Sequence, residues 1–221
     1  MNRIYINRAL IAIIFVTLFT VFAIPQNSNL NCSTENRRID LSVHQKNFQE
    51  ILVELSRKHR FPIGWQVASD DEMPVCKHPV DVQLRNVDIN QIMTKVISIC
   101  PSYSWEFVDG VVNVYPAVKE NTILDTKIEI VQVGNKTSVE ILDAIFELPD
   151  IKAQMTSTET TRDTTMPFWN SDSNTASRFS VELTNTNVRR LLNYLVTNTD
   201  QRAWIYYKVK DSQNRFALRF F

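Results

Sequence analysis

The stretch VDVQLRNVDINQIMTKVISI, residues 80–99, joins a strand pattern to a helix pattern and is the starting point for the fold prediction. Over residues 80–85, apolar and polar side chains alternate, which is typical of a strand with one buried face. Asp88 is a suitable N-cap, and the apolar residues after it recur at helical spacing, which predicts a helix over Ile89–Ile99. A strand therefore passes into a helix through one short turn.

Elements on both sides of this stretch complete a first module at residues 41–116. The patterns before it predict a strand, a helix and a strand, at Leu41–Val43, Phe48–His59 and Ile63–Val67. After it, two apolar runs flank Asp109-Gly110, a pair typical of a hairpin turn. We therefore predict the order βαββαβ, in which the last β stands for a hairpin of two strands, Tyr103–Val108 and Val111–Tyr115.

The same pattern returns in the second half of the chain. Six residues follow a similar or identical residue by 99 positions: Val82 and Val181, Leu84 and Leu183, Asn86 and Asn185, Ile89 and Val188, Ile92 and Leu191, Trp105 and Trp204. The triplet Glu-Ile-Leu recurs at a separation of 90, at residues 50–52 and 140–142. The second copy is therefore longer by nine residues (99 minus 90), which we place between Met155 and Arg178.

A second module is predicted at residues 126–221, after a linker at residues 117–125. Its expected strands are Lys127–Val133, Ile151–Met155, Arg178–Thr184, Ala203–Val209 and Arg215–Phe221, and its expected helices are Ser138–Glu147 and Val188–Thr197. A Ser/Thr-rich inserted loop is expected at residues 156–177. The predicted fold class is α+β, with two tandem βαββαβ modules that each form a small mixed sheet with two helices.

The N-terminus has the pattern of a Sec-type signal peptide. Two arginines and no acidic residue precede an apolar run over Ala9–Ile24, and the small residues at Val21 and Ala23 suit cleavage after Ala23. Residues 1–23 are therefore predicted to be removed on export to the periplasm or beyond, with a linker at residues 24–40. The alternative is an uncleaved anchor in the inner membrane, because the apolar run is only slightly shorter than the roughly 20 residues that span a bilayer.

Export also changes the interpretation of the three cysteines, since oxidising compartments favour disulfides over free thiols. Cys76 and Cys100 lie within the first module and are the candidate disulfide. Cys32 lies before that module and has no assigned role.

The residues of both modules resemble the short N-terminal domain shared by secretins and TonB-dependent transducers. The resemblance rests on the helix around residues 48–55, on the strand and turn at residues 82–88, and on the hairpin from Trp105 to Tyr115. It covers residues 41–115 and, less clearly, residues 127–221. The resemblance implies a periplasmic protein-interaction module of a Gram-negative type of bacterium.

No pattern for catalysis, metal binding or cofactor binding is found in the sequence. The glycines Gly64, Gly110 and Gly134 are too far apart for a phosphate-binding loop, and the three histidines lack metal-site spacing. Cys76-Lys77-His78 lacks a paired C-x-x-C partner. With 24 basic and 24 acidic residues, no basic field is available for nucleic acid. The sequence therefore predicts a protein that is not an enzyme, with no evident small-molecule substrate.

Two features suit a protein partner. Met166, Phe168 and Trp169 are apolar residues in the predicted polar loop, so they either fold back on the module or anchor a partner. A sheet of this order also leaves an edge strand that can accept a partner's strand. The recurring Trp105 and Trp204 are interpreted as core residues.

The expected function is that of an exported periplasmic adaptor that binds cell-envelope proteins of a secretion, transport or signalling assembly. The alternative is a membrane-anchored accessory or sensory subunit that keeps its N-terminal helix.

Overall fold

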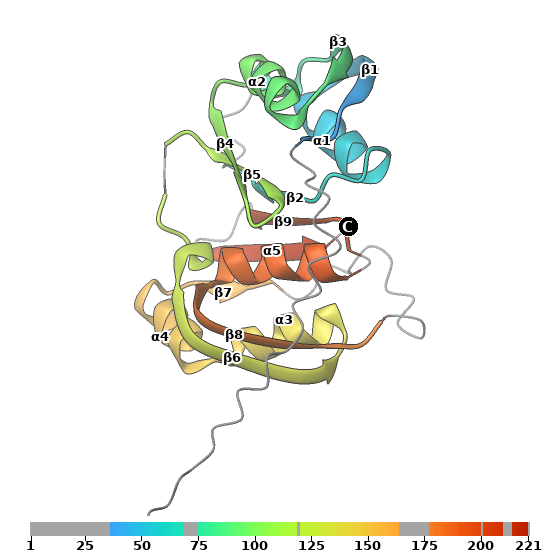
Figure 1. The fold of residues 1–221 in the computed structure, drawn as a ribbon. Coiled ribbons are helices and arrows are strands. Elements are labelled where there is room, and N and C mark those ends of the chain that lie inside the picture. The colour runs from blue at the N-terminus through green and yellow to red at the C-terminus, as the bar shows by residue number, and fades with distance from the viewer. Residues whose placement is uncertain are drawn as a thin grey trace, which may run out of the picture. The chain divides into compact units, whose positions relative to one another are not determined.

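A computed structural model describes residues 36–68, 75–118, 120–163, 177–199, 201–209 and 214–220. These residues form five α-helices and ten strands, so the predicted α+β class is confirmed. Residues Ser33–Phe221 make one compact unit. Figure 1 shows their arrangement, with the colour running along the chain from the N-terminus to the C-terminus.

The first half of the chain follows the predicted order closely. It consists of β1 (Ile39–Lys46), α1 (Phe48–Arg57), β2 (Ile63–Gln66), η3 (Val75–Lys77), β3 (Val80–Val87), α2 (Ile89–Ile99), β4 (Tyr103–Val108) and β5 (Val111–Pro116). Reciprocal hydrogen bonds between the N-cap and the third helical residue start both helices, through Asn47 and Glu50 for α1 and through Asp88 and Gln91 for α2. The strand-to-helix turns read from the sequence are therefore fixed by local contacts.

The second half consists of η4 (Ile123–Asp125), β6 (Lys127–Lys136), α3 (Ser138–Phe146), α4 (Pro149–Ser157), β7 (Thr161–Arg162), β8 (Phe179–Asn187), α5 (Val188–Asn198), β9 (Ala203–Lys208) and β10 (Arg215–Phe220). Its strand pairing repeats that of the first half. The antiparallel pair β1-β3 of the first half corresponds to the antiparallel pair β6-β8 of the second. The strand order β4-β5-β2 of the first half corresponds to the order β9-β10-β7 of the second.

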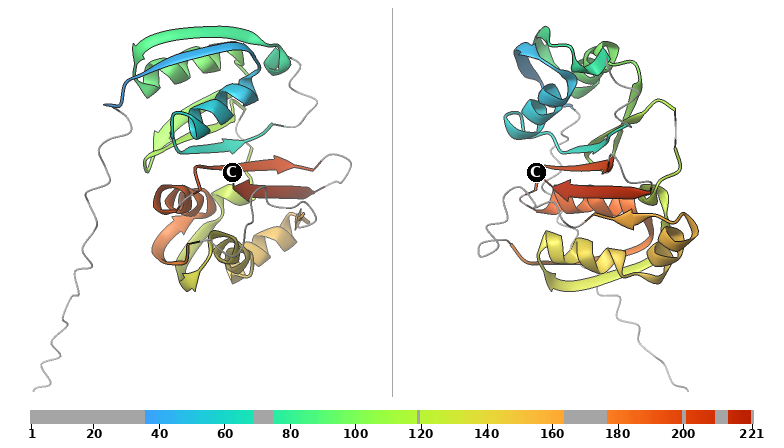
Figure 2. Two further views of the ribbon diagram at one scale, coloured as in Figure 1. Left: turned by 90° about the vertical axis from the view of Figure 1, so that its right-hand side faces the viewer. Right: turned by 180° about the vertical axis from the view of Figure 1, so that it is seen from behind.

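One sheet was predicted in each half, but the described strands form three sheets. β1-β3 and β6-β8 are separate two-stranded sheets, whereas the remaining strands join in the order β4-β5-β2-β9-β10-β7. Figures 1 and 2 show this six-stranded sheet between the helices of the two halves. Along β9, Ala203 and Ile205 face the first core, while Trp204 and Tyr206 face the second. The shared sheet therefore separates two hydrophobic cores.

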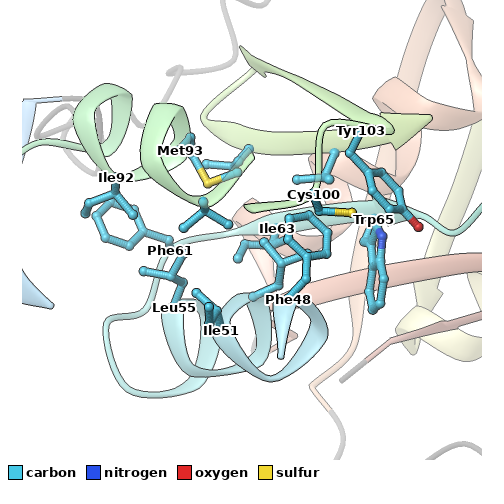
Figure 3. Close-up of a cluster of buried hydrophobic side chains, with 14 of the residues drawn as sticks. Phe48, Ile51, Leu55, Phe61, Ile63, Trp65, Ile92, Met93, Cys100 and Tyr103 are labelled. Carbon is cyan, nitrogen blue, oxygen red and sulfur yellow. The ribbon is translucent and has the colours of Figure 1, made fainter. Parts of the chain in front are cut away.

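The first core is centred on aromatic side chains from three elements (Figure 3). Phe48 stacks on Tyr103 with ring centroids 5.0 Å apart and meets Trp65 edge-on at 6.3 Å. The Tyr103 hydroxyl accepts a hydrogen bond from the Ala68 amide at 3.1 Å. Helix α1 is thereby fixed against both β2 and β4.

Backbone conformation repeats between the halves as well. Left-handed φ angles occur at Gln45 and Asn135 (50° and 49°), at Arg60 and Glu159 (55° and 52°), and at Asn86 and Asn185 (50° and 49°). Such angles are uncommon outside glycine, so their recurrence indicates the same chain path at three places. The separations are 90 residues for the first pair and 99 for the other two.

This recurrence corrects the predicted position of the nine extra residues. They lie between Asn135 and Glu159, where the single helix α1 is replaced by α3 and α4. The connection that follows has the same length in both halves, since 17 residues separate Ile63 from Val80 and Arg162 from Phe179. The inserted loop predicted at residues 156–177 is therefore wrong at its start, which includes the end of α4 and strand β7, whereas residues 164–176 lie outside the described part of the chain.

The strand predicted at Ile151–Met155 is also wrong, because these residues belong to α4. Pro149 occupies the first turn of α4, where its fixed φ and missing N–H favour a helix start. Leu148, the N-cap residue before it, has an extended backbone. Ile151 is the buried residue of this helix. Its packing into the second core selects the helix over the strand.

The predicted linker at residues 117–125 ends in η4, whose Ile123 and Leu124 are buried in the second core. The predicted linker at residues 24–40 includes the start of β1 at Ile39. The predicted signal peptide and Cys32 lie outside the described residues. In the described part of the chain, no helix is long and apolar enough to cross a bilayer.

Candidate functional site

The two halves of the chain meet at a junction where strand β2 of the first half pairs with strand β9 of the second. β2 and β9 run parallel, with Ile63, Gly64 and Trp65 opposite Ala203, Trp204 and Ile205. The Ile63 amide donates to the Arg202 carbonyl at 3.1 Å, and the Val67 amide donates to the Tyr206 carbonyl at 2.8 Å. Backbone hydrogen bonds between strands 140 residues apart therefore unite the halves.

Gly64 makes this junction possible. A Cβ atom at Gly64 would lie 2.3 Å from Cε2 and Cζ2 of the Trp204 ring, far inside van der Waals contact. Trp204 is fully buried, and its Nε1 donates to Asn193 Oδ1 at 3.0 Å. The ring of one half therefore occupies the space that a side chain on β2 would need.

Helix α5 fastens the junction through three polar residues, Arg189, Arg190 and Asn193, which we call the α5 clamp. Arg189 Nη2 donates to Gln66 Oε1 at 2.8 Å and lies 3.6 Å from Asp125 Oδ1. Asn193 Nδ2 donates to the Val108 carbonyl at 3.4 Å. The clamp thus connects α5 to β2 and to the end of β4.

Arg190 completes the clamp with a two-point contact to Asp109 in the β4–β5 turn. Its Nε and Nη2 donate to Oδ2 at 2.9 Å and to Oδ1 at 3.2 Å. The hydrogen bonds that Arg190 donates to Asp109 raise the pKa of the Arg190 guanidinium, with the charge of the carboxylate adding to the effect. Because the pair is substantially exposed, we expect its net contribution to stability to be small.

Tyr206 lies beside the clamp, opposite Gln66 in the strand pairing. Burial raises the pKa of its hydroxyl to about 12, and the carboxylates of Glu120 and Asp125 add to the shift. The hydroxyl is therefore neutral at physiological pH.

At one end of the six-stranded sheet, β4 has β5 as its strand neighbour on one side and no described strand on the other. The Val112 amide donates to the carbonyl of Pro62, the residue before β2, so Val112 and its β4 partner Phe107 form a non-hydrogen-bonded pair. By the alternation of an antiparallel ladder, the backbone groups of Phe107 and Trp105 point away from β5. These groups are arranged to accept a further strand.

The side chains of β4 are less buried than those of β9. Trp105 and Phe107 are half-buried against the first core, and Glu106 is exposed. The prediction of core packing therefore holds fully for Trp204 and only in part for Trp105. Sequence reasoning named both tryptophans but had no signal for the difference, which depends on which strand is covered.

At the other end, β7 consists of Thr161 and Arg162 and pairs in parallel with the start of β10. The predicted partner-binding residues Met166, Phe168 and Trp169 lie beyond it, outside the described residues. Of the two ends of the six-stranded sheet, β4 with six residues offers a longer edge to a partner than β7 with two.

The candidate disulfide pair lies together in the first half. Cys76 and Cys100 are bonded, with their Cα atoms 5.1 Å apart, and the bond joins η3 to the end of α2. The Ser102 hydroxyl lies 3.5 Å from the sulfur of Cys76 and 3.4 Å from that of Cys100. This disulfide fixes the segment that leads into β4.

Charged groups elsewhere form ion pairs. On α1, Glu54 pairs with Lys46 and, at 3.2 Å, with Lys58. Burial works to raise the pKa of the Glu54 carboxyl, but the two ammonium groups outweigh it and the pKa is lowered. Over the described ranges, no group of three His, Cys, Asp or Glu side chains is placed to hold a metal ion.

The chain matches no protein-family model, and no curated protein or solved structure is significantly similar to it. Function is therefore argued from the residues and their geometry.

Proposed function

We propose that this chain is an exported, non-catalytic binding protein of the bacterial envelope, which holds a partner protein on its β4 edge. The observation that carries the proposal is the outward backbone of Trp105 and Phe107 on a strand with no further described neighbour. Exposed backbone donors and acceptors on a sheet edge are a ready template for a partner's strand.

The N-terminal sequence supports export, because its charged start, apolar run and small residues are those of a signal peptide. The resemblance to the short N-terminal domain of secretins and transducers supports an envelope partner from a secretion, transport or signalling assembly. In the alternative function, a membrane-anchored accessory subunit, the same edge would act next to the inner membrane.

Site-specific photo-cross-linking in the cells that make the protein tests the proposal. A photoreactive amino acid replaces Glu106, which is exposed on β4, and in a matched variant it replaces Gln83, which is exposed on β3 of an outer sheet. We expect a cross-linked adduct with another envelope protein from position 106 and none from position 83. Absence of adducts from position 106, or the same adducts from both positions, contradicts the proposal.

The mass of the protein from fractionated cells separates the two locations. A soluble periplasmic chain that begins at Ile24 supports the adaptor, whereas a full-length chain in the membrane fraction supports the anchored subunit.

A further inference from the structure

The strand that β4 accepts can be characterised from the junction inside the same molecule. β4 and β9 hold equivalent places, because each is antiparallel to a strand, β5 or β10, that is itself parallel to the next, β2 or β7. Trp105 and Trp204 lie at the same position of these two strands, 99 residues apart. β9 already holds a partner strand on its outer side, namely β2.

The strand that pairs with the outer side of β9, namely β2, has three features. The strand is parallel, it has glycine opposite the tryptophan, and apolar residues flank that glycine. The glycine is required by space, because a Cβ at Gly64 would overlap the Trp204 ring. The flanking Ile63 and Trp65 lie on the opposite face of the sheet, in the first core.

The side chains that fasten β2 on β9 have no counterpart for a strand on β4. At the positions of the α5 clamp, 99 residues earlier, α2 carries Asn90, Gln91 and Thr94 in place of Arg189, Arg190 and Asn193, and all three are exposed. Gln91 is already engaged at the start of its own helix. A strand on β4 would therefore be held chiefly by backbone hydrogen bonds and by Trp105, as suits a separate and reversible partner.

We infer that β4 binds, in parallel, an extended segment of a partner protein that presents glycine opposite Trp105 between two apolar residues. This inference rests on the proposed function, since it specifies the partner's segment at the same edge. The chain itself contains a segment of this kind in β2, which provides a probe of known sequence.

The probe is a synthetic peptide of residues Phe61–Ala68, FPIGWQVA, with solubilising lysines at its end. It is titrated into the full chain in mild detergent, and hydrogen exchange of the amides of Trp105 and Phe107 is followed. We expect saturable protection of these amides, with the amides of β9 unchanged because β2 already covers that strand. The same peptide with Gly64→Val is expected to bind at least about tenfold more weakly, because its side chain meets the Trp105 ring.

Two matched variants of the protein test the backbone contact. Phe107→Pro and Phe107→Ala both lose the ring, but only the proline variant loses the N–H that points away from β5. We expect Phe107→Ala to retain binding and Phe107→Pro to lose it, with circular dichroism used to verify that each folds. If Phe107→Pro does not fold, the comparison of the glycine peptide with the Gly64→Val peptide still tests the inference.

Three outcomes overturn the inference. The first is no saturable protection at Trp105 and Phe107, and the second is equal binding of the glycine and valine peptides. The third is concentration-dependent self-association that protects these amides without peptide, which would make a second copy the occupant. A cross-link from position 106 without peptide binding rejects strand addition but leaves the proposed function standing, whereas absence of both rejects the proposed function itself.

Discussion

The two halves of the chain share a frame of strands and helices, yet each is secured in a different way. The first half has the disulfide between Cys76 and Cys100 and one helix, α1, between its first two strands. The second half carries Thr199 at the position equivalent to Cys100 and two helices, α3 and α4, in place of α1. The second half is instead fastened by its helix α5, which bonds to β2 and to the end of β4 in the first half.

The difference shows that a repeated frame does not imply repeated use of its surfaces. The equivalent strands β4 and β9 differ in burial because β2 covers β9, while no described strand covers β4. Local sequence specifies the frame, and long-range contacts such as that of the Trp204 ring with Gly64 specify which edge is joined.

Gly64→Ala is expected to have the largest effect, because the new Cβ would overlap a fully buried ring at the junction. We expect a loss of about 3 kcal/mol or more in the free energy of unfolding, measured by urea denaturation. The matched control is Gly134→Ala, whose Cβ would lie 3.8 Å from Ser180 Oγ, and a change within about 0.5 kcal/mol is expected there. Equal losses at both glycines would contradict the role of the Gly64–Trp204 contact.

Removal of the disulfide by Cys76→Ala with Cys100→Ala is expected to cost about 3 kcal/mol, because it releases a constraint over 24 residues. The loss should fall mainly on the first half. Hydrogen exchange should therefore show a larger drop in protection for β3 than for its counterpart β8. An equal drop in both strands would show that the halves open as one unit.

Trp204→Phe is expected to cost about 2 kcal/mol, because it leaves the buried Asn193 amide without its indole donor. Trp105→Phe, at the equivalent but half-buried position, is expected to cost less than about 1 kcal/mol. Thermal denaturation of the two variants measures the difference. Equal losses would mean that coverage of the strand does not set the contribution of its tryptophan.

The smallest effect is expected at the exposed end of the α5 clamp. A double-mutant cycle of Arg190→Gln and Asp109→Asn should give a coupling below about 1 kcal/mol, since solvent screens this pair. The coupling should decrease further at high salt. A larger, salt-independent value would show that the pair is a principal tie between the halves.

Much of the frame could be predicted from local sequence. The helix at Ile89–Ile99 has the predicted bounds, because its cap at Asp88 and its apolar spacing are both local signals. The strand predicted at Ile151–Met155 failed because a five-residue apolar alternation fits a short helix as well, and packing of Ile151 decided between them. The nine extra residues were misplaced for the same reason.

The candidate site was only partly accessible to sequence reasoning. A free sheet edge was expected, but the sequence gives no signal for which strand provides it. Trp105 and Trp204 were recognised as equivalent, whereas their different burial depends on β2. The α5 clamp was missed, because Arg189 and Arg190 are ordinary charged residues of a helix until their partners on the other half are known.

Most of the helices and strands, and their recurrence at a fixed spacing, could be read from the sequence alone, because caps, turn residues and apolar periodicity act over a few neighbouring positions. Tertiary packing was needed to pair β2 with β9, to place two cores on one sheet, and to leave β4 without a described strand on its outer side. Those outcomes depend on complementary shapes far apart in the chain, such as the space above Gly64 that the Trp204 ring fills.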